Sequence, residues 1–238
     1  MERYLNIVLP KIRSGSDFIS YLQLLHQYIV AAKNISPRYE KFFLQADTEN
    51  EAKAYEVPDQ FSQFEKILAQ LGKYPDTEDT FFLLGIWNGM DRQEDGRSFR
   101  MIFSNENSKN LFFDHRANAK FHFPLFYSDF DDDITDEINK LVILAFNVLP
   151  CTFITEYDFN YVSQYETYPE LIIGSALYGR KTDMDGMEGV RYDINNELIA
   201  LSSVAEKFDS GNPDHIMKAH AWEKQLLMTP KFRELLLR

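Results

Sequence analysis

The chain has 238 residues and a formal net charge of −12, and its composition is 45% hydrophobic and 15% aromatic. A chain with this much apolar area offsets the entropy lost on ordering, which excludes global disorder, and its length suits the single domain that we expect over residues 1–238. The negative field repels nucleic acid and anionic membranes and attracts basic protein surfaces, while a lone cysteine, Cys151, excludes an internal disulfide framework and a cysteine zinc site.

The chain is expected to be a soluble, cytoplasmic protein. Its N-terminus lacks a long apolar stretch and a small-residue cleavage site, and the longest apolar run, at residues 141–145 and 148–149, is shorter than the roughly 20 residues that cross a bilayer. The near absence of cysteine suits a reducing compartment.

Two amphipathic helices are predicted in the first third of the chain. The first begins at Ser16, a suitable N-cap, and ends before Pro37; the second begins near Pro58 and ends at Gly72. Apolar residues recur in both at helical spacing, which gives each helix one buried face. These residues are Phe18, Leu22, Leu25, Ile29 and Ala32 in the first helix, and Phe61, Phe64, Leu68 and Leu71 in the second.

Strand signals replace helical ones from residue 80. Residues 80–87 form a dense apolar run that predicts a buried strand, and Asn88-Gly89 ends it with turn residues. Residues 98–104 and 120–126 alternate apolar and polar side chains, as half-buried strands do, and residues 111–114 are a further short candidate.

The second half begins with a third helix, introduced by acidic residues 131–136 and closed by Pro150. Strands are then predicted at residues 152–158 and 170–178, followed by a hairpin of residues 190–194 and 197–201 around Asn195-Asn196. The buried face of the third helix is Ile138, Leu141, Val142, Ala145 and Val148.

The chain ends in two helices. Asn212 or Asp214 caps the first, and residues 231–237 form the second. The apolar face of the first is Ile216, Ala219, Trp222 and Leu226. The whole order predicts an α+β fold, in which a mainly antiparallel sheet is flanked by N-terminal, central and C-terminal helices.

Sequence motifs of nucleotide-binding loops, nucleophile elbows and zinc-protease helices are absent. His215 and His220 are five residues apart, so they point to different faces of a helix and do not form a metal pair. We therefore expect a non-enzyme with no metal, cofactor or catalytic residue. A hydrolase remains the alternative, because the 37 Asp and Glu residues include carboxylates that can converge in three dimensions.

Two acidic segments invite comparison with calcium loops. The run at residues 131–133 contains no glycine for the sharp turn of such a loop, so a solvated helix N-terminus is favoured. If Gly186 were the turn glycine, Lys181 and Tyr192 would occupy the first and last ligand positions, and neither is a carboxylate.

Negative charge is nevertheless clustered by segment, and such clusters dock basic partner surfaces or form ordinary solvated faces. We predict partner contacts in two clusters. The first is Asp129, Asp131, Asp132, Asp133, Asp136 and Glu137, and the second is Asp183, Asp185 and Glu188. A further acidic group is Glu49, Glu51, Glu56 and Asp59, relieved by Lys53. Trp87 and Trp222 continue apolar stripes, which favours core packing over a role as interface anchors.

Three stretches together resemble the immunity protein 52 family of bacterial polymorphic-toxin systems. They are Ile35-Ser36-Pro37 with residues 42–46 and Ala52; residues 84–89, which end in Trp87-Asn88-Gly89; and residues 197–202 and Phe208 followed by residues 211–216, Ala219 and Leu226. The resemblance extends over residues 18–227. It departs from the family pattern at residues 174–178, where the family has a Gly-Trp-Met-like strand.

The resemblance implies a cytoplasmic immunity protein of the kind linked to type VI secretion. Such a protein binds a toxin encoded beside it, often a nuclease with a restriction-endonuclease-like fold, and occludes its active site. The Trp87-Asn88-Gly89 and Asn212-Pro213 motifs would then be structural. We expect a partner with a basic surface and neither nucleic acid nor membrane as a ligand. A homo-oligomeric adaptor that associates through its aromatic-rich strands is the third possibility.

Overall fold

The computed structural model describes residues 3–11, 15–72, 83–90, 100–104, 116–123, 132–164 and 172–237. Its elements, in chain order, are β1 (Arg3–Lys11), α1 (Gly15–Ala32), the 3₁₀ helix η1 (Pro37–Tyr39), β2 (Phe43–Leu44), α2 (Glu49–Ala52), α3 (Phe61–Gln70), β3 (Leu83–Trp87), β4 (Arg100–Ser104), β5 (Arg116–Phe123), α4 (Asp132–Val148), β6 (Phe153–Asp158), α5 (Phe159–Ser163), β7 (Ala176–Arg180), α6 (Lys181–Met184), β8 (Val190–Asp193), β9 (Leu198–Ser202), α7 (Pro213–Met228) and α8 (Pro230–Leu237).

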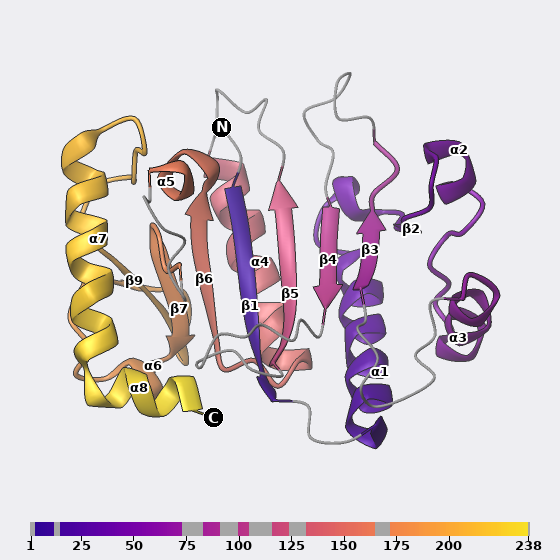
Figure 1. Cartoon of the computed structure of the whole chain (residues 1–238), viewed down its shortest axis with the longest axis horizontal. Coiled ribbons are helices and arrows are strands. Elements are labelled where there is room, and N and C mark those ends of the chain that lie inside the picture. Colours follow the sequence, from indigo (N-terminus) through magenta and orange to yellow (C-terminus); the bar gives the residue numbers. More distant parts are fainter. Residues whose placement is uncertain are drawn as a thin grey trace.

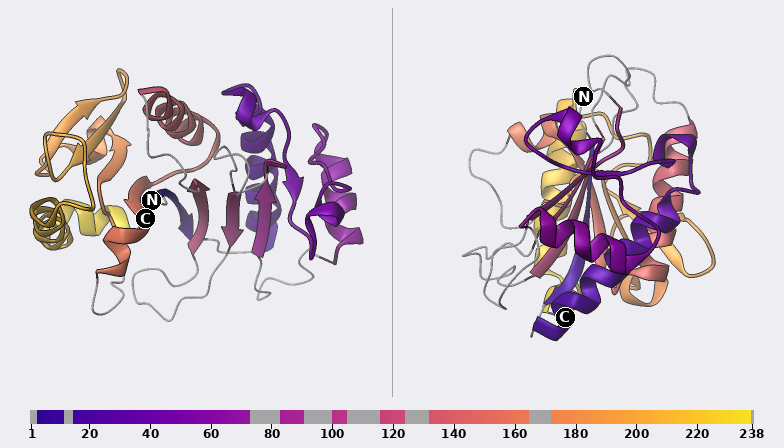
Figure 2. Two further views of the ribbon diagram at one scale, coloured as in Figure 1. Left: turned by 90° about the horizontal axis from the view of Figure 1, so that it is seen from above. Right: turned by 90° about the vertical axis from the view of Figure 1, so that its right-hand side faces the viewer.

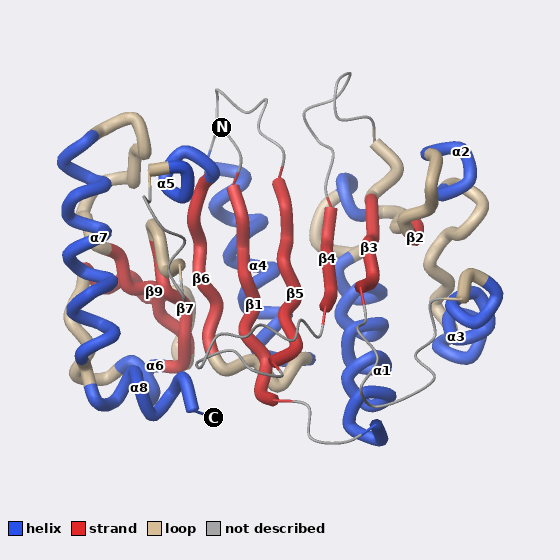
Figure 3. Tube along the Cα trace, viewed as in Figure 1, coloured by secondary structure: helices blue, strands red, loops and turns tan. Residues whose placement is uncertain are grey.

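One sheet of nine strands runs through these elements in the order β2-β3-β4-β5-β1-β6-β7-β9-β8 (Figures 1 and 3). Every pair of neighbouring strands is antiparallel, and β1 lies between β5 and β6, where Leu5 is opposite both Phe121 and Glu156. The α+β prediction, with a mainly antiparallel sheet and helices from both ends and the middle of the chain, is confirmed.

The sheet buries apolar side chains on both faces. Leu5 and Ile7 of β1 belong to the cluster that contains the buried faces of α1 and α4, whereas Val8 belongs to a second cluster with α7 and α8. Side chains alternate between the faces of a strand, so this division places the two helix pairs on opposite faces. Figure 2 shows α1 and α4 on one side of the sheet, with α7 and α8 at the β7–β9 end.

The long helices follow the predicted periodicity. Leu22, Leu25, Ile29 and Ala32 of α1 are buried, and so are four residues of α4, namely Ile138, Leu141, Val142 and Ala145. In α7, the Asn212 side chain accepts the backbone N–H of Asp214, so Asn212 is the N-cap, and Ile216, Ala219, Trp222 and Leu226 face the core. The hairpin of β8 and β9 is also confirmed.

Some predictions differ from the structure or lie outside the described residues, and one central element has no prediction. No strand was predicted at residues 3–11, which form the central strand β1. Helix α1 begins at Gly15, so Ser16 lies inside its first turn. The strand predicted at residues 170–178 begins only at Ala176, because Gly174 adopts a φ of 71° and bends the chain. Residues 111–114 lie outside the described residues.

A buried histidine joins α1 to the start of α3. The Nε2 of His26 donates to the carbonyl oxygen of Pro58 at 2.7 Å, and its ring packs against Phe61 and Phe64 with centroid separations of 5.6 and 4.9 Å. Burial lowers the pKa of His26, the bond to Pro58 opposes this change, and the Lys33 ammonium adds to it.

Protonation of His26 should therefore destabilise the fold. Below the ordinary histidine pKa of about 6.5 the unfolded chain takes up a proton that the folded chain resists, so stability is lost as the pH falls through this window, with a slope of at most about 1.4 kcal/mol per pH unit. His26→Gln keeps a donor for Pro58 but does not titrate. Urea unfolding between about pH 7.5 and about pH 5.5 should show a shallower loss for this variant, and equal slopes would contradict the assignment.

Two glycines provide a matched test of backbone packing. Gly72 and Gly174 have φ values of 62° and 71°, but a Cβ on Gly72 meets nothing within 4 Å, whereas one on Gly174 lies 2.6 Å from the Glu156 carbonyl oxygen. Gly72→Ala should cost only the left-handed backbone strain, about 1–2 kcal/mol. Gly174→Ala should cost about 1–3 kcal/mol more in urea unfolding, because the backbone must shift. Equal costs would refute the close approach.

Candidate functional site

A pocket of about 500 Å³ lies beside β2, the strand at one end of the sheet. It is lined by Gln45, Ala46, Asp47, Glu51, Tyr55, Leu71 and Gly85. The lining therefore combines two carboxylates with an aromatic ring and an aliphatic side chain. These residues come from the segment after β2, from α2, from the end of α3 and from β3.

Backbone pairing fixes one wall of this pocket. The N–H of Leu44 donates to the Tyr55 carbonyl oxygen at 2.9 Å, and the N–H of Gln45 donates to the Gly85 carbonyl oxygen at 2.8 Å. Gly85 gives the Gln45 side chain its room, because a Cβ there would lie 2.0 Å from the Gln45 Oε1. The glycine in the apolar run of β3 is thus a packing requirement of the pocket wall.

A capping box fixes the acidic wall. The Thr48 N–H donates to the Glu51 Oε2 at 3.2 Å, and the Glu51 N–H donates to the Thr48 Oγ1 at 3.3 Å. Asp47 precedes this box and is exposed. One oxygen of Glu51 is used by the cap, so Asp47 and the second oxygen of Glu51 give the pocket lining its negative charge.

The other two described carboxylates of this segment, Asp59 and Glu56, have different surroundings. Asp59 is paired with Lys33 at 2.8 Å, and this lysine lowers the pKa of Asp59 by hydrogen bonding and by its charge. Glu56 is exposed. The Lys53 ammonium lies 6.0 Å from the centre of the Trp87 ring, which engages the one lysine of the segment in a cation–π contact.

The predicted contact loop around Asp183, Asp185 and Glu188 follows α6 and is held by α7 and α8. The Trp222 Nε1 donates to the Glu188 carbonyl oxygen at 2.7 Å, and the Lys231 Nζ donates to the Asp185 carbonyl oxygen at 2.7 Å. The Glu188 side chain accepts from Gln225. Asp183 is half-buried, whereas Asp185 and Glu188 are exposed, and Glu188 is already bonded to Gln225.

The other predicted contact cluster is only partly described. Asp129 and Asp131 lie outside the described residues, and Asp132 and Asp133 begin α4 without described side chains. Asp136 is exposed and pairs with Lys140 at 2.6 Å. Asp136 is not among the residues that line the pocket.

Glu137 has a structural role that the sequence did not indicate. Its carboxylate accepts hydrogen bonds from the Ser36 Oγ at 2.7 Å and the Tyr39 hydroxyl at 3.2 Å, and it lies 3.7 Å from the Arg38 Nε. These contacts join α4 to η1, and the Glu137 side chain is only 16% exposed. The structure thus shows an internal role for Glu137, and its contact with a partner stays a prediction.

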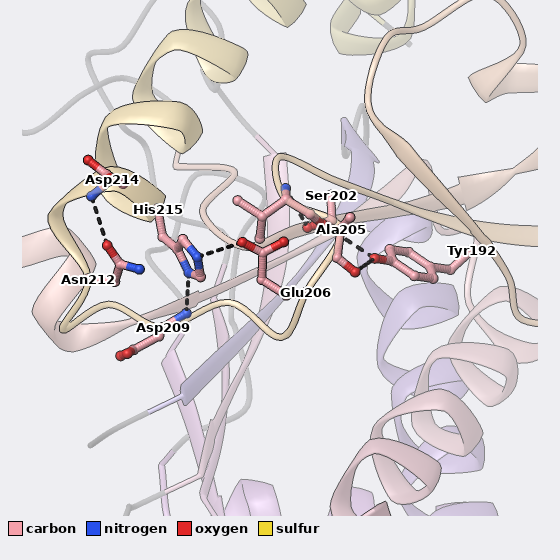
Figure 4. Close-up of polar contacts among 9 residues, drawn as sticks. Tyr192, Ser202, Ala205, Glu206, Asp209, Asn212, Asp214 and His215 are labelled. Carbon is pink, nitrogen blue, oxygen red and sulfur yellow. Dashed lines mark hydrogen bonds and ion pairs between the residues drawn. The ribbon is translucent and has the colours of Figure 1, made fainter.

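The connector between β9 and α7 is held by His215 (Figure 4). The Asp209 N–H donates to the His215 Nδ1 at 3.1 Å, so the ring proton lies on Nε2, which donates to the Glu206 carboxylate at 3.0 Å. His220 lies instead against the Tyr161 ring, with a centroid separation of 5.0 Å. The two histidines border one aromatic cluster, because the His215 ring lies 6.0 Å from the Phe208 ring, which lies 5.8 Å from the Tyr161 ring.

Two further carboxylates are buried and also serve the fold. Glu223 accepts the backbone N–H groups of Ile173 and Gly174, and Glu156 accepts the Tyr178 hydroxyl. Across the part of the chain that the structure describes, no group of three or more His, Cys, Asp and Glu side chains is arranged to hold a metal ion.

Searches with this chain against protein-family models and against curated proteins find no match. Within the described ranges, no helix has both the length and the apolar character that crossing a membrane requires. A functional assignment therefore depends on the geometry of the two acidic surfaces and on the pattern of the sequence.

Sequence reasoning found the acidic segment of the pocket but missed the pocket itself. The Thr48-x-x-Glu51 pattern is a readable signal of a capping box and would have placed Glu51 at a helix start. The contributions of Leu71 and Gly85 have no local signal, because they depend on how α3 and β3 lie beside the segment after β2.

Trp222 should fix the Asp185 loop. Trp222→Phe removes the donor to the Glu188 carbonyl and should cost about 1 kcal/mol in urea unfolding, with faster amide exchange at residues 185–189. Trp87→Phe is the matched control, because the Trp87 Nε1 donates to the Met90 carbonyl oxygen at 2.8 Å, away from this loop. Unchanged exchange in Trp222→Phe, or equal acceleration in the control, would contradict this role.

Proposed function

We propose that this protein binds a partner protein with a basic surface and neutralises it by covering that surface, as an immunity protein covers the active site of a toxin. The observation that carries the proposal is the pocket beside β2, whose lining includes the carboxylates of Asp47 and Glu51 together with Tyr55 and Leu71. Occlusion of this kind needs shape fit, complementary charge and a buried anchor, and it needs no chemistry.

The pocket suits a lysine or arginine side chain from the partner. The methylene stem of such a side chain can pack on Tyr55 and Leu71, while its charged end pairs with the carboxylates of Asp47 and Glu51. Arginine is among the residues most enriched at interface hot spots, so a partner arginine in this pocket would act as the anchor. The pocket lies beside β2, which ends the sheet together with α2 (Figure 1).

The Asp185 loop supplies a second, pre-ordered acidic contact. Because Trp222 and Lys231 already hold its backbone, little conformational entropy is lost when a partner binds it. Its negative charge, within a chain of net charge −12, also accelerates the approach of a basic partner.

A nuclease toxin is the partner class that this chemistry favours. A nuclease cleft carries lysine and arginine residues because it holds the phosphate backbone of its substrate. An acidic surface that enters such a cleft competes for those residues. This proposal agrees with the resemblance of the sequence to the immunity protein 52 family.

Co-expression tests the function directly. The protein encoded by the neighbouring gene is expressed in a bacterial host with and without this chain, and growth and complex formation are measured. Rescue of growth together with a purified complex is expected. A neighbour that is harmless, or that kills equally in the presence of this chain, would refute the immunity role.

Charge reversal tests the surface. Asp47→Lys and Asp185→Lys change exposed residues, and each should slow association roughly tenfold at low salt and make the association rate less sensitive to salt, because steering is lost. Asp47→Lys should also speed dissociation, because the new lysine repels the positively charged side chain of the partner in the pocket. Glu234→Lys on α8 makes the same charge change elsewhere and is the control. Unchanged kinetics in both variants would remove this surface from the proposal.

A further inference from the structure

Strand β8 ends the sheet opposite to β2, and its own side chains are solvent-exposed. It pairs with β9 alone, and Arg191, Tyr192 and Asp193 are exposed. Among the described residues, no backbone group bonds to the outer edge of β8. An edge of this kind presents N–H and C=O groups that can pair with another strand.

The register with β9 shows which backbone groups face outward. Tyr192 is opposite Ala200, and the Ile194 N–H donates to the Leu198 carbonyl oxygen at 3.0 Å. Hydrogen-bonding direction alternates along an antiparallel strand, so Tyr192 and Ile194 bond toward β9. The outward N–H and C=O groups of β8 therefore belong to Arg191 and Asp193.

We propose that β8 is a homodimerisation edge, at which two copies pair their β8 strands antiparallel about a two-fold axis through Tyr192. In this register Arg191 of each copy is opposite Asp193 of the second copy, and the two residues exchange both of their outward backbone hydrogen bonds. The inference is independent of the proposed function.

The charges of the edge residues favour this register over the other symmetric registers. In a symmetric antiparallel pair the two-fold axis is perpendicular to the sheet, and it lies between one residue and the same residue of the second copy. An axis at Arg191 would oppose two arginines, and an axis at Asp193 would oppose two aspartates. An axis at Tyr192 gives opposite charges directly across the strands, twice over, which is the favourable cross-strand arrangement.

Two side chains of the edge have contacts within their own chain. Asp193 pairs with Lys181 at 2.9 Å, but its side chain is still 69% exposed, so its carboxylate stays accessible to Arg191 of the second copy. The Tyr192 hydroxyl donates to the Ala205 carbonyl oxygen at 2.6 Å, which fixes its ring (Figure 4). The two Tyr192 residues form a non-hydrogen-bonded pair, in which opposed side chains are closest, so their rings cover each other.

The dimer is expected to be weak. A strand of four residues buries less surface than the roughly 800 Å² per partner of a standard interface. Each copy also carries a net charge of −12, and the resulting long-range repulsion is screened beyond about 10 Å at 0.1 M salt. The association is therefore measured at that ionic strength or above.

Sedimentation velocity over a concentration series tests the inference. The wild-type chain should dimerise reversibly as its concentration rises. Arg191→Asp and Asp193→Arg should each weaken the dimer at least tenfold, because each puts like charges opposite each other at two places. The combined swap, R191D with D193R, restores the opposed pairs and should recover the dimer. Lys224→Asp on α7 makes the same charge change as Arg191→Asp at an exposed site and is the control.

A backbone variant separates pairing from charge. Arg191→Pro removes an outward N–H and leaves the β8–β9 bonds of Tyr192 intact, so it should abolish the dimer with little change in monomer unfolding. A wild-type chain that stays monomeric at every concentration would overturn the proposal. So would a dimer that survives both single reversals or the proline, or a charge swap that fails to restore association.

Discussion

The burial of β1 between β5 and β6 is the constraint on which the other contacts of this molecule depend. Leu5 and Ile7 on one face of β1 join the cluster of α1 and α4, and Val8 on the other joins that of α7 and α8. Apolar area is thereby removed from water on both faces of one strand, which is the dominant favourable term in folding. A nine-residue N-terminal segment holds the early and late halves of the chain in one sheet.

The same topology places the two proposed interaction sites toward the two ends of the sheet. The acidic pocket lies beside β2 and the exposed strand β8 lies at the far end. The outer side of β2 is already paired with residues 55–57, whereas β8 pairs with β9 alone among the described residues. The Asp185 loop directly precedes β8, so a partner on that loop and a second copy on β8 would be neighbours.

The carboxylates divide into an inward-facing set, which stabilises the fold, and an exposed set, which is available to a partner. Glu137, Glu156 and Glu223 are directed into the protein, where hydroxyl and backbone N–H groups offset the cost of burying them. Asp47 and Asp185 remain exposed on backbone that caps and side-chain bonds hold in place. Asp47 lies beside β2 and Asp185 lies between α6 and β8, so the second set forms two separate acidic sites toward opposite ends of the sheet.

Local pattern alone determined the α+β class, the long helices α1, α3, α4 and α7 and the β8–β9 hairpin, because helical periodicity and turn residues act over a few positions. It narrowed the cap of α7 to Asn212 or Asp214, and the structure selected Asn212. The tertiary structure alone decided the place of β1, the pocket and the inward turn of Glu137. Leu5 meets Phe121 and Glu156 across more than a hundred residues, and no short window records such a pairing. A glutamate near a helix start looks the same in sequence whether it faces solvent or, like Glu137, a serine, a tyrosine and an arginine from another part of the chain.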